Sequence, residues 1–185
     1  MNTKYYLTKS IVTLVGVSAA IVATGLNLPS FAQQRAAETQ ERIGVYDSRA
    51  VAVAYAGSPF QEKKMKEMRA QLKKAKEGGD TKEVSRLEAA GQTWQSKLMK
   101  QGFGTAPVDD ILANIASELP EIQKAAGVTS LISKWNKTEL EKHPKAKQVD
   151  VTMRLVDAFH PNETQRKHAI EIQKKRPEKI KEMNP

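Results

Sequence analysis

The sequence predicts an α+β protein, mostly helical, in which a small β-containing body carries a protruding antiparallel helical (coiled-coil) hairpin. The first observation is composition: 28% of the 185 residues are charged and only 5% are aromatic, which favours long exposed helices. The second is a pair of charged segments with heptad-like apolar spacing on either side of Gly78-Gly79. The third is a pair of short sequences, RIGVYDS and VTSLISKW, that have the alternation of strands.

Residues 1–32 have the layout of a secretory signal peptide. Two lysines precede an apolar run at 11–28, and small residues end the leader. This layout predicts cleavage between Ala32 and Gln33 and export to the periplasm, with a flexible lead-in at 33–41. The alternative is an uncleaved membrane anchor, because the run is close to the roughly 20 residues that span a bilayer.

The body is predicted from two separated segments, residues 42–57 and 101–160. Each contains one of the strand-like sequences, and a small-residue helical turn follows the first. Residues 136–148 are polar and interrupted by Pro144, so the presence of a third strand there stays open. Because two short strands bury little surface, we expect association between copies of the chain through the sheet.

Three helices are predicted after the hairpin. The first is capped by Thr105 and kinked at Pro120, whose ring disturbs the helical hydrogen bonds. The second is the amphipathic sequence VDVTMRLVDAF. The third begins after Asn162 in the C-terminal segment, residues 161–185, which we expect to form one helix and a tail.

Residues 58–100 are predicted to form the hairpin arm. A Ser-Pro pair starts its first helix, and Gly78-Gly79 ends it. Asp80 and Glu83 are expected to form a capping box for the second helix. The apolar residues of both helices repeat at spacings of three and four and define a seam: Met65, Met68, Leu72, Ala75, Val84, Leu87, Gly91, Trp94 and Leu98.

The arm has a basic excess, since residues 58–100 contain eleven Lys and Arg against six Asp and Glu. Gly91 lies in the seam, where its missing side chain leaves room for Met68 or Leu72. The candidate contact residues combine lysines with apolar seam residues: Lys63, Lys66, Lys73, Lys74, Met65, Met68 and Trp94. Two alternatives stay open, namely that the lysines are only a solvated face and that the methionines only pack in the seam.

The residue patterns of enzymes and metal sites are absent from the sequence. It contains no cysteine and none of the GxSxG, phosphate-loop or HExxH patterns. The pair Asp109-Asp110 is explained by a place at a helix N-terminus, where carboxylates favour the dipole. His160 and His168 lack a third ligand at the usual spacing. We therefore expect no catalytic activity, no cofactor and no metal.

Four sequence pieces together resemble one family. They are IGVYDSRAV, the Ser-Pro helix start, VTSLISKW and VDVTMRLVDAF, in an order that covers residues 42–160. This arrangement resembles the OmpH-like family of Skp-type periplasmic chaperones. The resemblance implies a homotrimer whose small β-body holds helical tentacles, and the binding of unfolded outer-membrane or other envelope proteins without ATP. Basic arms suit acidic clients and contact with the membrane surface, and no nucleic acid is expected.

The sequence departs from the family in the arms, which are much shorter, and in residues 136–148, which replace an expected strand. A function of a different class therefore stays open. The alternative is a structural or adaptor coiled-coil protein of the cell envelope that binds one fixed partner.

Overall fold

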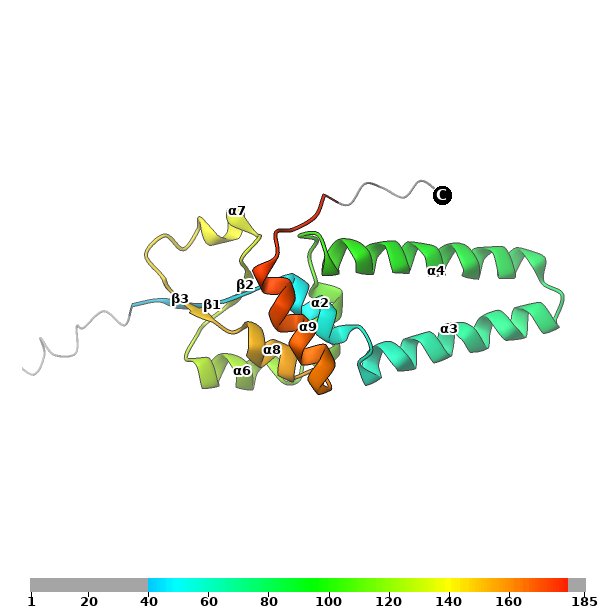
Figure 1. Ribbon diagram of the computed structural model, residues 1–185, viewed down its shortest axis with the longest axis horizontal. Helices are drawn as coiled ribbons and strands as arrows, with labels where there is room; N and C mark the ends of the chain where they lie inside the picture. The colour runs from blue at the N-terminus through cyan, green and yellow to red at the C-terminus, as the bar shows by residue number, and fades with distance from the viewer. Residues whose placement is uncertain (1–39, 180–185) are drawn as a thin grey trace, which may run out of the picture. The chain divides into compact units, whose positions relative to one another are not determined.

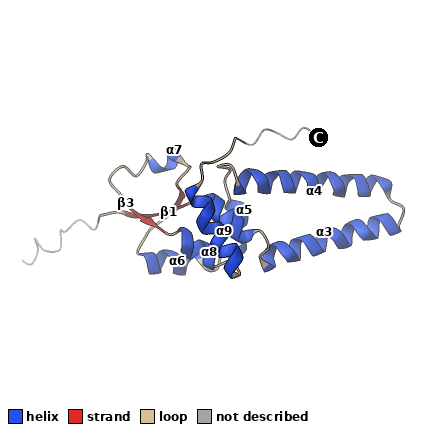
Figure 2. Ribbon diagram, in the orientation of Figure 1, coloured by secondary structure: helices blue, strands red, loops and turns tan. Residues whose placement is uncertain are grey.

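A computed structural model describes residues 40–179, which lie within one compact unit, Thr39–Pro185. The predicted signal peptide, its cleavage site at Ala32 and Gln33, and most of the lead-in lie outside the described residues. The described chain is mostly helical and contains a small three-stranded parallel sheet (Figure 2). In chain order its elements are β1 (Arg42–Tyr46), α2 (Ser48–Tyr55), α3 (Pro59–Glu77), α4 (Thr81–Gly102), α5 (Asp109–Leu112), the 3-10 helix η1 (Ala113–Ile115), α6 (Leu119–Ala126), β2 (Leu131–Ser133), α7 (Lys137–Leu140), β3 (Lys147–Asp150), α8 (Thr152–Asp157) and α9 (Glu163–Lys174).

The sheet has the strand order β2-β1-β3, and both pairs are parallel. The strands β1 and β2 agree with the two predicted strands. β3 was not predicted, because three of its four residues are exposed and it lacks the apolar alternation of a half-buried strand. Pairing with β1 defines it instead, and Lys147 N donates to the backbone oxygen of Glu41, the residue before β1, at 2.7 Å.

Gly44 in the central strand β1 allows neighbouring side chains to approach the backbone closely. A Cβ atom at this position would lie 2.9 Å from Leu131 Cδ2 and 3.1 Å from Val151 Cγ2. Any larger residue would therefore push apart β1 and the elements on either side of it.

Helix α2 lies at the centre of the body and contacts α4, α8 and α9. Its small side chains are fully buried, including Ala50, Val51 and Ala54, so the surrounding helices pack close to its backbone. Asp47 caps the helix by accepting a hydrogen bond from Arg49 N.

The C-terminal helix α9 is part of the core of the body. Asn162 caps it, as predicted, and forms a capping box with Gln165. Ala169 and Ile172 are buried against the same cluster as α2 and α8. The body therefore includes more than the two predicted segments, since β3 completes its sheet and α9 adds to its core.

The single kinked helix predicted after Thr105 is wrong. The segment forms three short helices, α5, η1 and α6, and α5 begins after Val108 rather than after a threonine cap. Pro120 lies in the first turn of α6, where its missing N–H leaves no helical hydrogen bond unmade. The proline therefore starts a helix here and does not kink one.

Helices α3 and α4 with their connecting turn extend from the body and are called the arm below (Figure 1). The bounds of α3 match the prediction, and α4 runs two residues further, to Gly102. Asp80 caps α4 by accepting from Glu83 N. The reciprocal half of the expected capping box is wrong, because the Glu83 carboxylate binds Arg86 instead.

Candidate functional site

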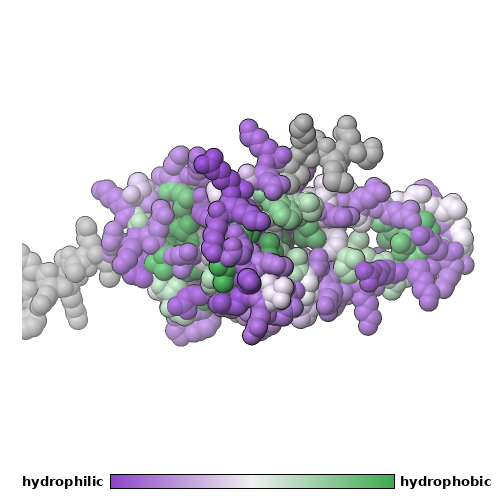
Figure 3. All heavy atoms as spheres, viewed as in Figure 1, coloured by the Kyte–Doolittle hydropathy of each residue, from purple (hydrophilic) through white to green (hydrophobic). Residues whose placement is uncertain are grey.

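The two helices of the arm face each other across a cleft of about 970 Å³. Its apolar lining comes from both helices and consists of Met65, Met68, Leu72, Leu87, Trp94 and Leu98. Nearer the turn the helices pack closely, since Ala75 and Leu87 are buried. Towards the body the apolar side chains are only half-buried. Figure 3 shows apolar atoms between the two helices and hydrophilic atoms on their outer faces.

Gly91 faces Met68 across the cleft, as the sequence pattern predicts. A Cβ atom on Gly91 would have one neighbour within 4 Å, the Met68 Cε atom at 3.7 Å. This distance is an ordinary van der Waals contact, so the glycine leaves empty space that a larger side chain would fill.

The predicted lysines divide between the cleft and the outer surface. Lys66 lines the cleft beside the two methionines and Trp94. Lys63, Lys73 and Lys74 are exposed and do not line it. The arm is instead bridged by Lys76, a residue outside the predicted set, whose Nζ lies 3.1 Å from Glu88 Oε1.

The base of the arm is fastened to the body through Asp110. Lys97 Nζ lies 2.9 Å from its Oδ2 atom, and Gln101 Nε2 donates to its Oδ1 atom at 2.7 Å. Burial acts to raise the pKa of Asp110, but the hydrogen bonds from Lys97 and Gln101 outweigh it, and the pKa lies below its ordinary value. The sequence interpretation missed this contact; the signal was that Lys97 and Gln101 lie four residues apart, on one helix face.

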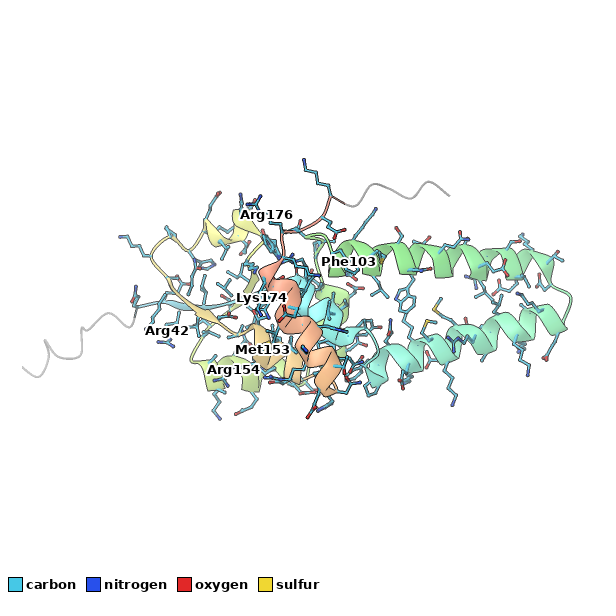
Figure 4. All side chains as sticks on the ribbon, viewed as in Figure 1. Arg42, Phe103, Met153, Arg154, Lys174 and Arg176 are labelled. Atoms are coloured by element: carbon cyan, nitrogen blue, oxygen red, sulfur yellow. The ribbon has the colours of Figure 1, made fainter. Side chains whose placement is uncertain are left out.

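A second apolar surface at the base of the arm was also missed. Met99 and Phe103 are exposed to 40% and 39% although both are large and apolar. They line a pocket of about 340 Å³ that shares Gln61, Gln95 and Leu98 with the cleft. Figure 4 shows Phe103 at the body end of α4. The apolar surface therefore continues from the cleft to the body.

A buried ionic network lies at the carboxyl end of β1. Arg49 Nη2 donates to Asp47 Oδ2 at 2.8 Å, and both side chains are 1% exposed. Lys134 Nζ lies 2.8 Å from the same oxygen, and Trp135 Nε1 donates to Oδ1 at 3.1 Å. Arg49 also donates to Lys175 O at 3.0 Å. The network joins the ends of β1 and β2 to the segment after α9.

The pKa of Asp47 reflects this network. Burial acts to raise the pKa, but hydrogen bonds from Arg49, Lys134 and Trp135 outweigh it, and the pKa lies below its ordinary value. Each carboxylate oxygen of Asp47 already has its partners within the protein. This arrangement fits a structural role, because it leaves no free acceptor for a ligand.

Within residues 40–179, no helix combines the length and the apolar character needed to cross a bilayer. The same residues bring together no group of three or more His, Cys, Asp and Glu side chains fit to bind a metal ion. Comparison of the chain with protein-family models, curated proteins and solved structures gave no match.

Proposed function

We propose that this chain is an ATP-independent periplasmic holdase-type chaperone of the OmpH-like kind, which binds unfolded outer-membrane or other envelope proteins. The observation that carries the proposal is the arm, which is charged on its outer faces and lined by methionines inside. The sequence pieces that resemble the OmpH-like family support the same function.

In this proposal α3 and α4 act as an antiparallel coiled-coil hairpin. The seam is closed near the turn by Ala75 and Leu87, and Lys76 and Glu88 add an ion pair across it. Towards the body the seam opens and leaves Met65 and Met68 accessible. Such a hairpin has a closely packed tip and an accessible apolar region nearer its base.

Methionine suits a surface that must accept many sequences. Its unbranched side chain and polarizable sulfur adapt to apolar groups of different shape. The exposed lysines of the arm add electrostatic attraction to acidic clients and to the negatively charged membrane surface. Several weak contacts from several arms hold a client through avidity.

We also propose that the mature chain, exported after cleavage of the signal peptide at Ala32, forms a homotrimer through its body. The strand β3 supports this assembly, because it lies at the edge of the sheet and Lys147, Gln148 and Asp150 are exposed. An exposed strand edge offers unpaired backbone groups to a second chain.

The function is tested by diluting a urea-unfolded outer-membrane protein into buffer that contains the mature chain and no ATP. We expect stoichiometric amounts of the chain to suppress light scattering by aggregates, and to do so for several unrelated unfolded clients. A chain that suppresses no aggregation and binds one folded envelope protein would instead be the structural adaptor.

A further inference from the structure

The cleft of the arm is long enough to hold a segment of another chain. Together with the pocket at the base, its apolar surface extends along α4 from Leu87 to Phe103. Sixteen residue steps of an α-helix cover about 24 Å. A volume of about 970 Å³ would also suit a small ligand. The cleft is open along the helices, however, because most of its apolar side chains are half-exposed.

The apolar lining residues of each helix lie on one face. On α3, Met65, Met68 and Leu72 follow the spacing of one helix face, and on α4 Trp94 and Leu98 do the same. Two helices with a half-buried seam form a groove that the apolar stripe of an amphipathic helix can fill. The empty space beside Gly91 deepens this groove at its middle.

The charges that line the cleft indicate which kind of helix would bind. Lys66 and Arg69 lie one turn apart on α3, and neither forms an ion pair with another described residue. On the opposite side, Glu88 is neutralised by Lys76. Glu62, at the body end, is the remaining acidic residue of the lining. The middle of the cleft is therefore basic and complements acidic side chains.

The same charges disfavour two occupants from the chain itself. The arm of a second copy also contains eleven basic and six acidic residues between positions 58 and 100, so two arms repel each other. The apolar run at 11–28 of the leader is the second candidate occupant. It is preceded by Lys4 and Lys9 and contains no acidic residue, so it does not complement the basic cleft. An acidic partner chain lacks this repulsion.

We infer that the cleft binds a single amphipathic helical segment with an apolar stripe and acidic flanks, supplied by the unfolded client. The inference rests on the proposed function and assigns it a site and a class of ligand. One arm clamps one client segment between its own two helices, so binding at the cleft needs no cavity shared between arms.

The first test fills the cleft without removing any charge. The probe is a fluorescein-labelled peptide of about 16 residues, a length that matches the ~24 Å surface as a helix. It carries leucines at the i, i+3, i+4 and i+7 positions and glutamates elsewhere.

Gly91→Leu places a side chain in the groove and favours the helix. Ala89→Leu, at an exposed position of α4, places the same leucine side chain outside the cleft. Fluorescence anisotropy should show binding weakened by about tenfold or more for Gly91→Leu, as for loss of a central hot spot, and unchanged binding for Ala89→Leu.

The second test reverses the charge of the lining. Lys66→Glu with Arg69→Glu should weaken binding of the glutamate peptide and strengthen binding of the same peptide made with lysines. The matched control is Lys137→Glu with Lys145→Glu, which makes the same change of charge on exposed positions of the body that do not line the cleft. Circular dichroism should show the glutamate peptide gaining helicity on binding.

The outcomes separate the inference from the proposed function. Equal binding by the wild type, Gly91→Leu and Ala89→Leu overturns the cleft as the site, even if all three suppress aggregation of an unfolded client. Cleft-dependent peptide binding without any suppression of aggregation retains the site and overturns the chaperone function. If the wild type self-associates and Gly91→Leu abolishes that, the occupant is a second copy and the inference is wrong.

Discussion

Lys97 of α4 and Asp110 of α5 form an ion pair, with Nζ 2.9 Å from Oδ2, where the arm meets the body. Gln101, one turn further along α4, is fully buried and donates to the other oxygen of the same carboxylate. Val108 and Ile111, on either side of the Asp109-Asp110 pair, are buried in the core. The base of the arm is therefore tied to the body by one carboxylate that has two partners on a single face of α4.

Lys97 and Gln101, the two partners of Asp110, should contribute unequally to the free energy of unfolding. Asp110→Asn keeps an acceptor for Gln101 but removes the half-exposed ion pair, so the unfolding free energy should fall by less than about 1 kcal/mol. Asp110→Ala also leaves the buried Gln101 amide without this acceptor, which costs about 1–3 kcal/mol. Urea unfolding of both variants compares them, and equal losses would show that the hydrogen bond contributes nothing.

Removing the buried carboxylate of Asp47 should lower the free energy of unfolding much more. Asp47→Asn leaves the buried Arg49 guanidinium without its counter-charge, a change that costs about 3–5 kcal/mol. The control is Asp157→Asn, which breaks an exposed ion pair with Arg166 and should cost less than about 1 kcal/mol. Urea unfolding at neutral pH gives both values, and similar losses for the two variants would contradict a structural role for the network.

Acidification provides an independent check on Asp47. Its pKa in the folded protein lies below its ordinary value of 3.8. A carboxyl group of this kind stabilises the fold fully above about pH 5 and loses that contribution as the pH falls through the folded-state pKa. The difference in unfolding free energy between the wild type and Asp47→Asn should therefore shrink on acidification. If the difference in unfolding free energy between the two proteins instead grew below pH 4, the lowered pKa of Asp47 would be contradicted.

The exposed lysines of the arm should contribute to client binding through charge. Reversing Lys66, Lys73 and Lys74 to glutamate should weaken binding of an acidic unfolded client, most at low salt. There the screening length is about 30 Å, against about 8 Å at physiological ionic strength. The control reverses three exposed lysines of the body, Lys124, Lys137 and Lys145. Anisotropy titrations at two salt concentrations measure the affinity of the arm variant and of the body control for the client. If the arm variant binds the client as tightly as the wild type at both salt concentrations, the arm lysines are only a solvated face.

The proposed trimer should be held by the body and not by the arms. A Gly/Ser linker in place of residues 62–96 removes most of the arm but keeps Phe60 and Leu98, which pack against the core. It also keeps the Lys97 contact at the base. Static light scattering should give three times the mass of the shortened chain. A monomer for the full mature chain at micromolar concentration would contradict the proposal.

The sequence predicted those elements whose signals are local. Ser58 and Asn162 cap their helices, and the alternation around Ile43 marks β1, because caps and periodicity act within a few residues. The strand β3 could not be predicted in this way, since its exposed polar residues are extended only by hydrogen bonds to β1, about 100 positions earlier. The break between α5 and α6 was missed because an apolar stripe continues across it.

The candidate site was predicted only in part for a similar reason. Heptad spacing places Met65, Met68 and Trp94 on facing sides of the arm, and the structure brings them together in the cleft. Spacing does not give the distance between the two helices, so the opening of the cleft towards the body was not predicted. The exposed Met99 and Phe103 were missed because they lie outside the heptad pattern.

The most direct test of the account observes the methionine methyl groups of the arm by NMR while an unfolded outer-membrane protein is added. The mature chain is labelled with ¹³C-methyl methionine, and the signals are assigned with single Met→Leu variants. If the arm holds the client, the signals of Met65 and Met68 should shift or broaden, while that of Met153, which packs against the core of the body, should not. Unchanged Met65 and Met68 signals in the presence of bound client would contradict the account.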